Sequence, residues 1–151
     1  MKIVILAKSV MLGSCFLRNL SGIKDFEVFA FSKEELDITD SALLDSTLKK
    51  ISPDFVVNCT GYTAVDNAET DKEVAFEVNG YACGKLAVAC KDSGAILMHF
   101  STDYVFDGKV SDGYAENDRP NPINVYGASK LEGENLIRKN CDKYYIIRTS
   151  W

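Results

Sequence analysis

The sequence predicts an α/β fold, a doubly wound parallel sheet with helices on both faces, and two observations lead to it. Short apolar runs rich in Ile and Val alternate along the chain with segments whose apolar residues recur at helical spacing. The apolar runs are continuous, which is typical of parallel strands that are buried on both faces. With 151 residues, 46% of them hydrophobic, the chain is long enough for one domain, and we expect residues 1–151 to form it.

The first part of the chain predicts two strand-helix units. Lys2–Ala7 is an Ile- and Val-rich run that predicts a strand, and Leu12–Leu20 has an apolar residue at every fourth position, which predicts a helix. Glu27–Phe31 predicts the second strand. Asp40 is a favourable N-cap for a second helix over Ala42–Ile51, which a Ser-Pro pair then ends.

The middle of the chain predicts another such unit and a fourth strand. Phe55–Cys59 is a short buried strand, and Lys72–Lys91 carries apolar residues at helical spacing. Gly94 is expected to stop this helix, because glycine readily ends helices in a left-handed conformation. Ala95–Ser101 is the fourth strand.

The last part of the chain predicts a functional loop at the carboxyl edge of the sheet, where ligands of such folds bind. The irregular stretch Thr102–Val125 is longer than a structural connection needs. A hydroxyl from Ser101 or Thr102 is expected to face the ligand crevice. Tyr126–Lys139 predicts a helix after the loop, and Tyr144–Thr149 a fifth strand.

Charge and hydropathy exclude several classes of function. The net charge is -5 and the basic residues are scattered, so we expect neither a nucleic-acid nor a membrane partner. The longest apolar run near the start, Ile3–Ala7, is too short for a signal peptide or a membrane span, so a cytoplasmic protein is expected.

The cysteines and the single histidine predict core residues. The five cysteines form no CxxC pair and are odd in number, so we expect reduced, mostly buried thiols, no disulfide framework and no metal. They are Cys15, Cys59, Cys83, Cys90 and Cys141. His99 lies in the apolar run AILMHFS and is expected to be a core histidine rather than a catalytic one.

A Tyr-x-x-x-Lys pattern occurs twice, and position separates the two copies. Tyr and Lys at this spacing share a helix face, so the ammonium is expected to lower the phenol's pKa from about 10 and make it a proton donor near neutral pH. Tyr126 with Lys130 opens a helix at the carboxyl edge and is the catalytic candidate, a capped helix start with an exposed lysine being the alternative. Tyr81 with Lys85 lies roughly 15 Å along its helix and is expected to pack.

Seven stretches carry a resemblance to a known family. In order, they read IVILAKSVMLG, LDITD, NCTGYTAVDNAE, EVNGYACGKLA, HFSTDYVFDG, PNPINVYGASKLEGE and IIRTSW. Over essentially its whole length the chain resembles the amino-terminal part of the dTDP-4-dehydrorhamnose reductases, the RmlD-like branch of the extended short-chain dehydrogenase/reductases. The resemblance implies an NAD(P)-binding Rossmann-like domain, NADPH or NADH as cofactor, and reduction of the C4 ketone of a dTDP-4-dehydro-6-deoxy sugar in dTDP-rhamnose and polysaccharide biosynthesis.

The resemblance also implies roles for individual residues. Thr102 would hydrogen-bond the substrate carbonyl, Tyr126 would protonate the developing alkoxide, and Lys130 would tune Tyr126 and hold the nicotinamide ribose. Further substrate contacts would come from Asp103, Tyr104 and Trp151. The implied cofactor-binding residues are Leu12, Gly13, Lys33, Asp37, Ile38, Thr60, Gly61, Tyr62, Thr63, Asn79, Ser101, Tyr126 and Lys130.

Lys33 bears on the choice of cofactor. It follows the second predicted strand, where an acidic residue would favour NAD, so the sequence supports NADPH at least as well as NADH. An ordinary surface lysine is the alternative.

The first turn departs from the family pattern. The family reads roughly TGANGQLG there, whereas this chain reads LAKSVMLG, with Ala7 and Val10 in place of the first two glycines. Gly13 is expected to keep its packing role. A branched Val10 with positive φ would cost about 1–2 kcal/mol, and its methyls would project toward phosphate oxygens, so weakened dinucleotide binding is expected. Lys8 either compensates as a nearby charge or is solvated.

The end of the sequence is the second departure. In the family, RTSW is followed by residues that build a sugar-nucleotide lobe, so the substrate lobe is expected to be absent from this chain, which is either a fragment or a shortened protein. Surface that the lobe would cover makes a homo-oligomer an expectation. Two functions stay open: a nucleotide-sugar reductase or its cofactor domain, and a non-catalytic Rossmann module with a regulatory or scaffolding role.

Overall fold

A single parallel sheet forms the centre of the computed structural model, which describes residues 1–150. Its strand order is β2-β1-β3-β4-β5, and each neighbouring pair is parallel. The strands are β1 (Lys2–Leu6), β2 (Glu27–Phe31), β3 (Phe55–Asn58), β4 (Ile96–Thr102) and β5 (Tyr144–Thr149). The doubly wound α/β prediction is therefore confirmed, and every predicted strand end lies within one residue of the observed one.

The helices also follow the predicted order. The α-helices are α1 (Met11–Leu20), α2 (Ser41–Ile51), α3 (Lys72–Phe76), α4 (Ala82–Ser93) and α5 (Val125–Asn140). Short 3-10 turns are η1 (Asn67–Glu69) and η3 (Asp103–Val105). The caps are those expected: Asp40 accepts a hydrogen bond from the Leu43 amide at 3.0 Å, and Gly94 ends α4 with a φ of 78°.

The predicted helix Lys72–Lys91 contains an irregularity that its apolar spacing did not reveal. The π-helical turn η2 (Glu77–Tyr81) joins α3 to α4. The wide turn contains Asn79, whose buried side chain hydrogen-bonds outside the helix. Such turns often occur at functional sites.

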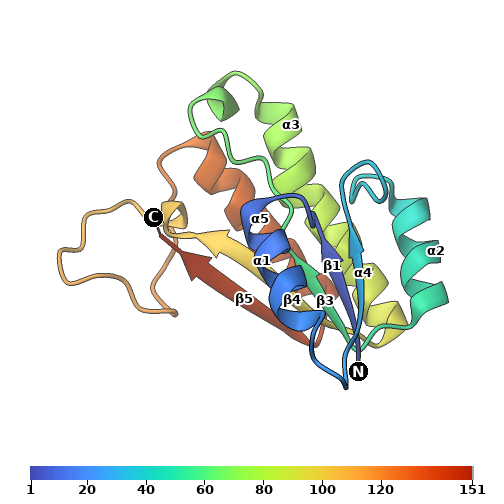
Figure 1. Ribbon diagram of the computed structural model, residues 1–151. Coiled ribbons are helices and arrows are strands. Elements are labelled where there is room, and N and C mark those ends of the chain that lie inside the picture. The colour runs from blue at the N-terminus through green and yellow to red at the C-terminus, as the bar shows by residue number, and fades with distance from the viewer. Residues whose placement is uncertain (151) are drawn as a thin grey trace.

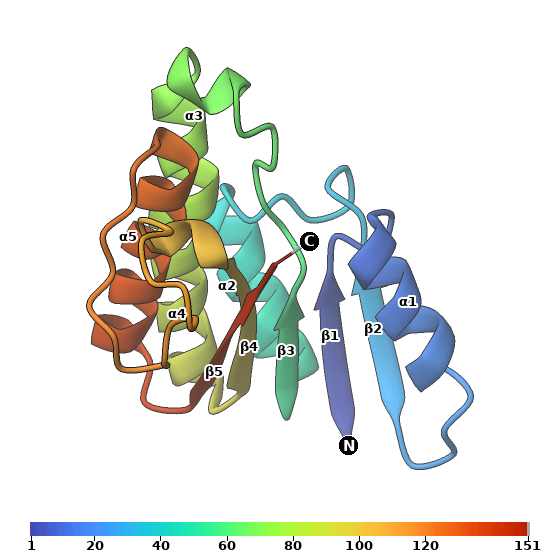
Figure 2. The same cartoon turned by 90° about the vertical axis from the view of Figure 1, so that its left-hand side faces the viewer.

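Helices cover the two faces of the sheet unequally (Figures 1 and 2). Helices α2, α4 and α5 pack on one face, where Leu44, Leu86 and Ile137 join the larger core. The other face carries α1, whose Phe16 and Leu17 pack over a smaller cluster of strand residues. Figure 2 shows α1 beside β1 and β2, away from the other helices. The smaller cluster leaves its aromatic and sulfur-containing side chains only partly buried.

The turn between β1 and α1 carries its strain at Ala7. Ala7 has a φ of 62°, in the left-handed region, whereas Val10 has a φ of -82° and is extended. The strain predicted for Val10 is thus wrong, because the tight turn falls at the first glycine position of the family pattern. A Cβ on Gly13 would lie 2.1 Å from the Ala7 carbonyl oxygen, so the predicted packing role of Gly13 is confirmed.

Replacing Ala7 with glycine is expected to raise the free energy of unfolding by about 1 kcal/mol. A residue with a Cβ in the left-handed region costs the folded state about 1–2 kcal/mol. Glycine removes this cost, and the extra entropy that it gives the unfolded chain offsets only part of the gain. Urea unfolding measures the change. The same substitution at Ala42, inside α2, is the matched control and is expected to lower the stability by about 0.5–1 kcal/mol. A loss of stability at both positions would contradict strain at Ala7.

The cysteines are free thiols in the described part of the chain. Three of them are buried, namely Cys83, Cys90 and Cys141, as expected of core thiols. Burial raises the pKa of Cys59 to about 12, so this thiol stays protonated at neutral pH. Within residues 1–150, no helix is both long and apolar enough to cross a membrane.

Candidate active site

Thr102 and Tyr126 meet at the carboxyl edge of the sheet. Thr102 ends β4 and Tyr126 lies in the first turn of α5, and their side chains are nearly buried. Asn124 caps α5 by accepting a hydrogen bond from the Gly127 amide at 2.7 Å. A Cβ on Gly127 would lie 2.1 Å from the Tyr104 carbonyl oxygen, so this glycine lets η3 pack against α5. The loop after β4 is thereby held against Tyr126.

The pKa of Tyr126 is raised, not lowered as the sequence predicted. Burial raises it most, hydrogen bonding by Thr102 lowers it, and the negative charge of Asp103 raises it further. Lys130 shares the helix face with Tyr126, but its ammonium donates to the carbonyl oxygen of Phe100 at 2.6 Å. The Tyr126 phenol is therefore protonated at neutral pH and can act as a proton donor.

Lys130 lies in a buried polar cluster that the sequence did not predict. Its side chain is buried, which lowers its pKa, and its Nζ lies 3.4 Å from Nε2 of His99. His99 is fully buried, as predicted for a core histidine, and its Nδ1 lies 3.0 Å from Nδ2 of Asn58. Burial, followed by the charge of Lys130, lowers the pKa of His99 well below 6.5, so the ring is neutral.

The loop after β3 is held by Asn79. The Asn79 Oδ1 accepts from the Tyr62 amide at 2.8 Å, and its Nδ2 donates to the Tyr62 carbonyl at 3.0 Å and to the Ser129 hydroxyl at 3.0 Å. Both of its amide hydrogens are thus used inside the protein. Asn79, predicted to line the crevice, fastens the loop that contains Thr60, Gly61, Tyr62 and Thr63 to α5.

The predicted cofactor-binding residues after β2 differ in how exposed they are. Lys33 is largely exposed and lies 3.8 Å from Asp37, while Ile38 belongs to the larger core. Lys8 is 32% exposed and forms an ion pair with Glu35 at 2.7 Å, so its charge is shared with a carboxylate at the surface. This pair joins the first turn to the segment after β2.

The amino terminus of α1 fits a phosphate group. No side chain caps the helix at Val10, so its first backbone N–H groups are left for solvent or a ligand. The helix starts at the carboxyl end of β1, where the fold places the pyrophosphate of a dinucleotide. The predicted contacts Leu12 and Gly13 lie in this first turn. Residues that fit a dinucleotide are therefore present. The branched side chain of Val10 is 43% exposed at the same helix end, where a phosphate would approach.

The other predicted substrate and cofactor residues differ in exposure. Asp103 and Tyr104 are exposed at the carboxyl edge, and the Tyr104 ring packs edge-on against Tyr126 with centroids 5.6 Å apart. Among the described residues, the buried Ser101 hydroxyl has no hydrogen-bond partner. Trp151 lies outside the described residues.

A buried carboxylate missed by the sequence reasoning stabilises the back of the site. Glu134 on α5 accepts from Arg148 at 2.9 and 2.7 Å and from Arg138 at 2.9 Å. Burial is the largest single effect and raises its pKa, but the hydrogen bonds that the carboxylate accepts and the charges of Arg148 and Arg138 together outweigh it and leave the pKa lowered. The Arg148 guanidinium also lies 4.9 Å from the centre of the Phe106 ring. The Glu134–Arg148 pair therefore connects α5, β5 and the long loop.

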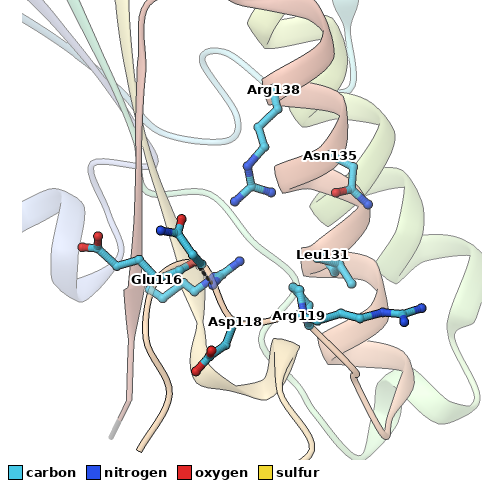
Figure 3. A pocket seen from close by; sticks show the side chains of 9 residues that line it. Glu116, Asp118, Arg119, Leu131, Asn135 and Arg138 are labelled. Carbon is cyan, nitrogen blue, oxygen red and sulfur yellow. Dashed lines mark hydrogen bonds between the residues drawn. The ribbon is translucent and has the colours of Figure 1, made fainter.

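Two open hollows lie away from Tyr126. One, of about 420 Å³, lies between α5, β5 and residues 116–120. Figure 3 shows Arg138 and Asn135 extending from α5, opposite Glu116 and Asp118 of the loop. The other, of about 500 Å³, lies at the amino ends of the strands, beside Ser52. Because ligands of this fold bind at the carboxyl edge, we assign the candidate site to Thr102, Tyr126 and Lys130.

Comparison with known sequences places the whole chain in one group of proteins. Residues 1–151 match the family model described as RmlD substrate binding domain. A dTDP-4-dehydrorhamnose reductase of Burkholderia thailandensis is 40% identical over 151 residues, covering 100% of this chain and 50% of that protein. A probable low-salt glycan biosynthesis reductase of Haloferax volcanii is 40% identical over 150 residues, covering 93% of this chain and 50% of that protein. The chain spans about half the length of these curated relatives.

Solved structures show the same backbone. A crystal structure of dTDP-4-dehydrorhamnose reductase from Bacillus anthracis in complex with NADP superposes with a TM-score of 0.97 and 37% identity, covering 99% of this chain and 53% of that one. UDP-glucose 4-epimerase from Brucella ovis, in complex with NAD, gives a TM-score of 0.88 at 20% identity, covering 97% and 51%. The second likeness shows the Rossmann-like fold alone.

Proposed function

The chain belongs to the RmlD substrate binding domain family, and we propose that it forms the dinucleotide-binding part of an NADPH- or NADH-dependent nucleotide-sugar reductase. The substrate would be a dTDP-4-dehydro-6-deoxy sugar, reduced at its C4 ketone. The observation that carries the proposal is the meeting of the Thr102 hydroxyl and the protonated Tyr126 phenol at the carboxyl edge of the sheet.

The residues of the chain account for proton transfer to a ketone. A ketone oxygen that accepts hydride at its carbon develops negative charge, which a nearby O–H donor stabilises and then protonates. Tyr126 supplies the proton because its phenol is protonated at neutral pH. Thr102 lies beside it, and its hydroxyl, which donates to Asp103 Oδ1 at 3.1 Å, would turn to the same oxygen and orient it. Both side chains are nearly buried, so the proton is passed within a site that excludes most water.

The nicotinamide dinucleotide, when bound, supplies the hydride. The uncapped first turn of α1 would hold its pyrophosphate, and Lys130 would hold the nicotinamide ribose. Lys33, exposed after β2, leaves room for a ribose 2'-phosphate, which supports NADPH as well as NADH. Val10 at the start of α1 supports a lower affinity than a glycine there would give.

Titration with NADPH and NADH tests the proposal. The chain is expected to bind at least one of them saturably below millimolar concentration, followed by nucleotide fluorescence or calorimetry. Lys130→Met is expected to weaken binding by about tenfold or more, because a charged hydrogen bond contributes about 1.5–3 kcal/mol. Lys85→Met is the matched control in the second Tyr-x-x-x-Lys copy, where Lys85 pairs with Glu77 on the surface, and is expected to bind as the unchanged chain does.

The same titration decides between this proposal and a non-catalytic module. The exposed branched side chain of Val10 at the start of α1 favours the module, because a phosphate would approach there. An absence of saturable binding by the unchanged chain would refute the reductase proposal and favour a regulatory or scaffolding role. Equal losses in Lys130→Met and Lys85→Met would place the dinucleotide elsewhere.

A further inference from the structure

The amide of Asn58 has only one orientation that its neighbours allow. Its Oδ1 faces the Thr60 backbone amide at 3.1 Å and the Thr60 hydroxyl at 2.6 Å. A backbone N–H can only donate, so the atom that faces it must be the oxygen. The Nδ2 group therefore points the other way, at 3.0 Å from Nδ1 of His99 and 3.7 Å from Sγ of Cys83.

This orientation determines the tautomer of His99. Because Asn58 donates to Nδ1, that ring nitrogen must carry the lone pair. The ring is fully buried and neutral, so its single proton lies on Nε2. The other tautomer would set an Nδ1–H against the Asn58 amide donor at 3.0 Å, whereas this one sets the Nε2–H against Lys130 at the longer distance of 3.4 Å, and the shorter contact decides.

The N–H of His99 is directed at Lys130. The two nitrogens, Nε2 and Nζ, lie 3.4 Å apart. An ammonium carries donors and no lone pair, so no hydrogen bond can form between it and an Nε2–H. Within residues 1–150, the Phe100 carbonyl is then the one protein acceptor near the Lys130 ammonium, at 2.6 Å. Two of its three N–H groups are left without a protein acceptor.

We propose that Asn58 and His99 are positioning residues that deny Lys130 a second protein acceptor, so that its remaining N–H groups are kept for the ribose hydroxyls of a bound dinucleotide. The ribose part rests on the proposed function. Burying a cation with two unpaired donors is costly, and a ligand that brings hydroxyl acceptors removes this cost. The series of contacts from Thr60 through Asn58 and His99 to Lys130 thus favours binding of a ligand that carries hydroxyl groups.

The tautomer can be observed directly, because the sequence contains one histidine. In a long-range nitrogen-proton NMR spectrum of the untagged, nitrogen-15-labelled chain, we expect a protonated Nε2 and an unprotonated Nδ1 at neutral pH. A protonated Nδ1, or protons on both nitrogens, would overturn the proposal. This spectrum requires neither a dinucleotide nor activity.

Asn58→Asp reverses the hydrogen bond while keeping the shape of the side chain. The carboxylate can still accept from Thr60 but can only accept from His99, so the proton is expected to move to Nδ1. The Nε2 lone pair then accepts from Lys130, and the affinity for NADPH is expected to fall by about 10- to 100-fold, the effect of diverting a charged hydrogen bond. Cys83→Ala, which removes the other contact of Nδ2, is the control and should leave the tautomer and the affinity unchanged.

An uncharged variant covers the case in which Asn58→Asp does not fold. In His99→Gln, the side-chain oxygen can turn to Lys130, and a similar loss of NADPH affinity is expected without a new charge. Unchanged affinity in a folded Asn58→Asp or His99→Gln variant would overturn the positioning role. If the unchanged chain binds no dinucleotide, the proposed function and the ribose contact both fail, while the NMR spectrum still decides the tautomer.

Discussion

Tyr126→Phe is expected to lower the rate of ketone reduction by about a hundredfold to ten-thousandfold, the usual contribution of a positioned proton donor. The change removes the phenol O–H and leaves the ring that packs against Tyr104. Because the pKa of Tyr126 is raised, most of all by burial, the wild-type phenol is protonated at neutral pH, and the variant loses this proton donor. The rate is measured as NADPH oxidation with a dTDP-4-dehydro-6-deoxy sugar, in a protein long enough to bind that sugar nucleotide.

The second Tyr-x-x-x-Lys copy, Tyr81 with Lys85, provides the matched control for this experiment. Tyr81→Phe also removes a phenol O–H four residues before a lysine, but Tyr81, which was predicted to pack, is instead 49% exposed in η2. We expect its rate and its affinity for NADPH to match those of the wild type. A Tyr126→Phe variant of nearly full activity would show that another group donates the proton.

Glu134→Ala is expected to lower the free energy of unfolding by about 3–5 kcal/mol, a large part of the stability of an ordinary domain. The substitution leaves Arg148 without its two charged hydrogen bonds and opens a void under α5. Urea unfolding measures the loss. Glu77→Ala is the matched control: its ion pair with Lys85 is 3.0 Å long but exposed, so the loss there is expected to be below about 1 kcal/mol. Equal losses in the two variants would contradict the role of Glu134.

Glu134 also implies a pH dependence of stability. Its pKa in the folded protein is lowered from the ordinary value of 4.5, so its carboxylate favours the folded state above that pH. This contribution is lost as the pH falls below 4.5 through the folded-state pKa. The stability difference between wild type and Glu134→Ala is therefore expected to shrink in acid, as measured by unfolding at several pH values.

The regular elements of the fold could be predicted because local signals agree with one another there. The run at Phe55–Cys59 is apolar except for Asn58, and Asp40 and Gly94 are strong helix-end signals that the structure confirms. The π-helical turn at Glu77–Tyr81 could not be predicted, because the apolar spacing continues through it and the hydrogen bonds of Asn79 inside it are tertiary. Asn79 bonds to Tyr62, which lies 17 residues earlier in the chain, and no local pattern reports this pairing.

The candidate site was predictable in its residue types and not in its hydrogen bonds. The spacing of Tyr126 and Lys130 places them on one helix face, but the partner of the ammonium is Phe100, from β4. Likewise, the run around His99 indicates burial, while its contact with Asn58 depends on the register between β3 and β4. For Ala7 and Val10, the sequence shows that glycines are missing, and only the backbone shows which position is left-handed.

The strand order has a consequence for how the sheet can grow during synthesis. Every strand after β1 pairs with a strand that lies earlier in the chain: β2 and β3 flank β1, then β4 joins β3 and β5 joins β4. Each strand therefore finds its pairing partner already synthesised. The sheet can therefore assemble vectorially, with each new strand docking on a finished edge. The catalytic candidates then come together late. Thr102 ends β4, and Tyr126 follows it in α5, the last helix before the final strand.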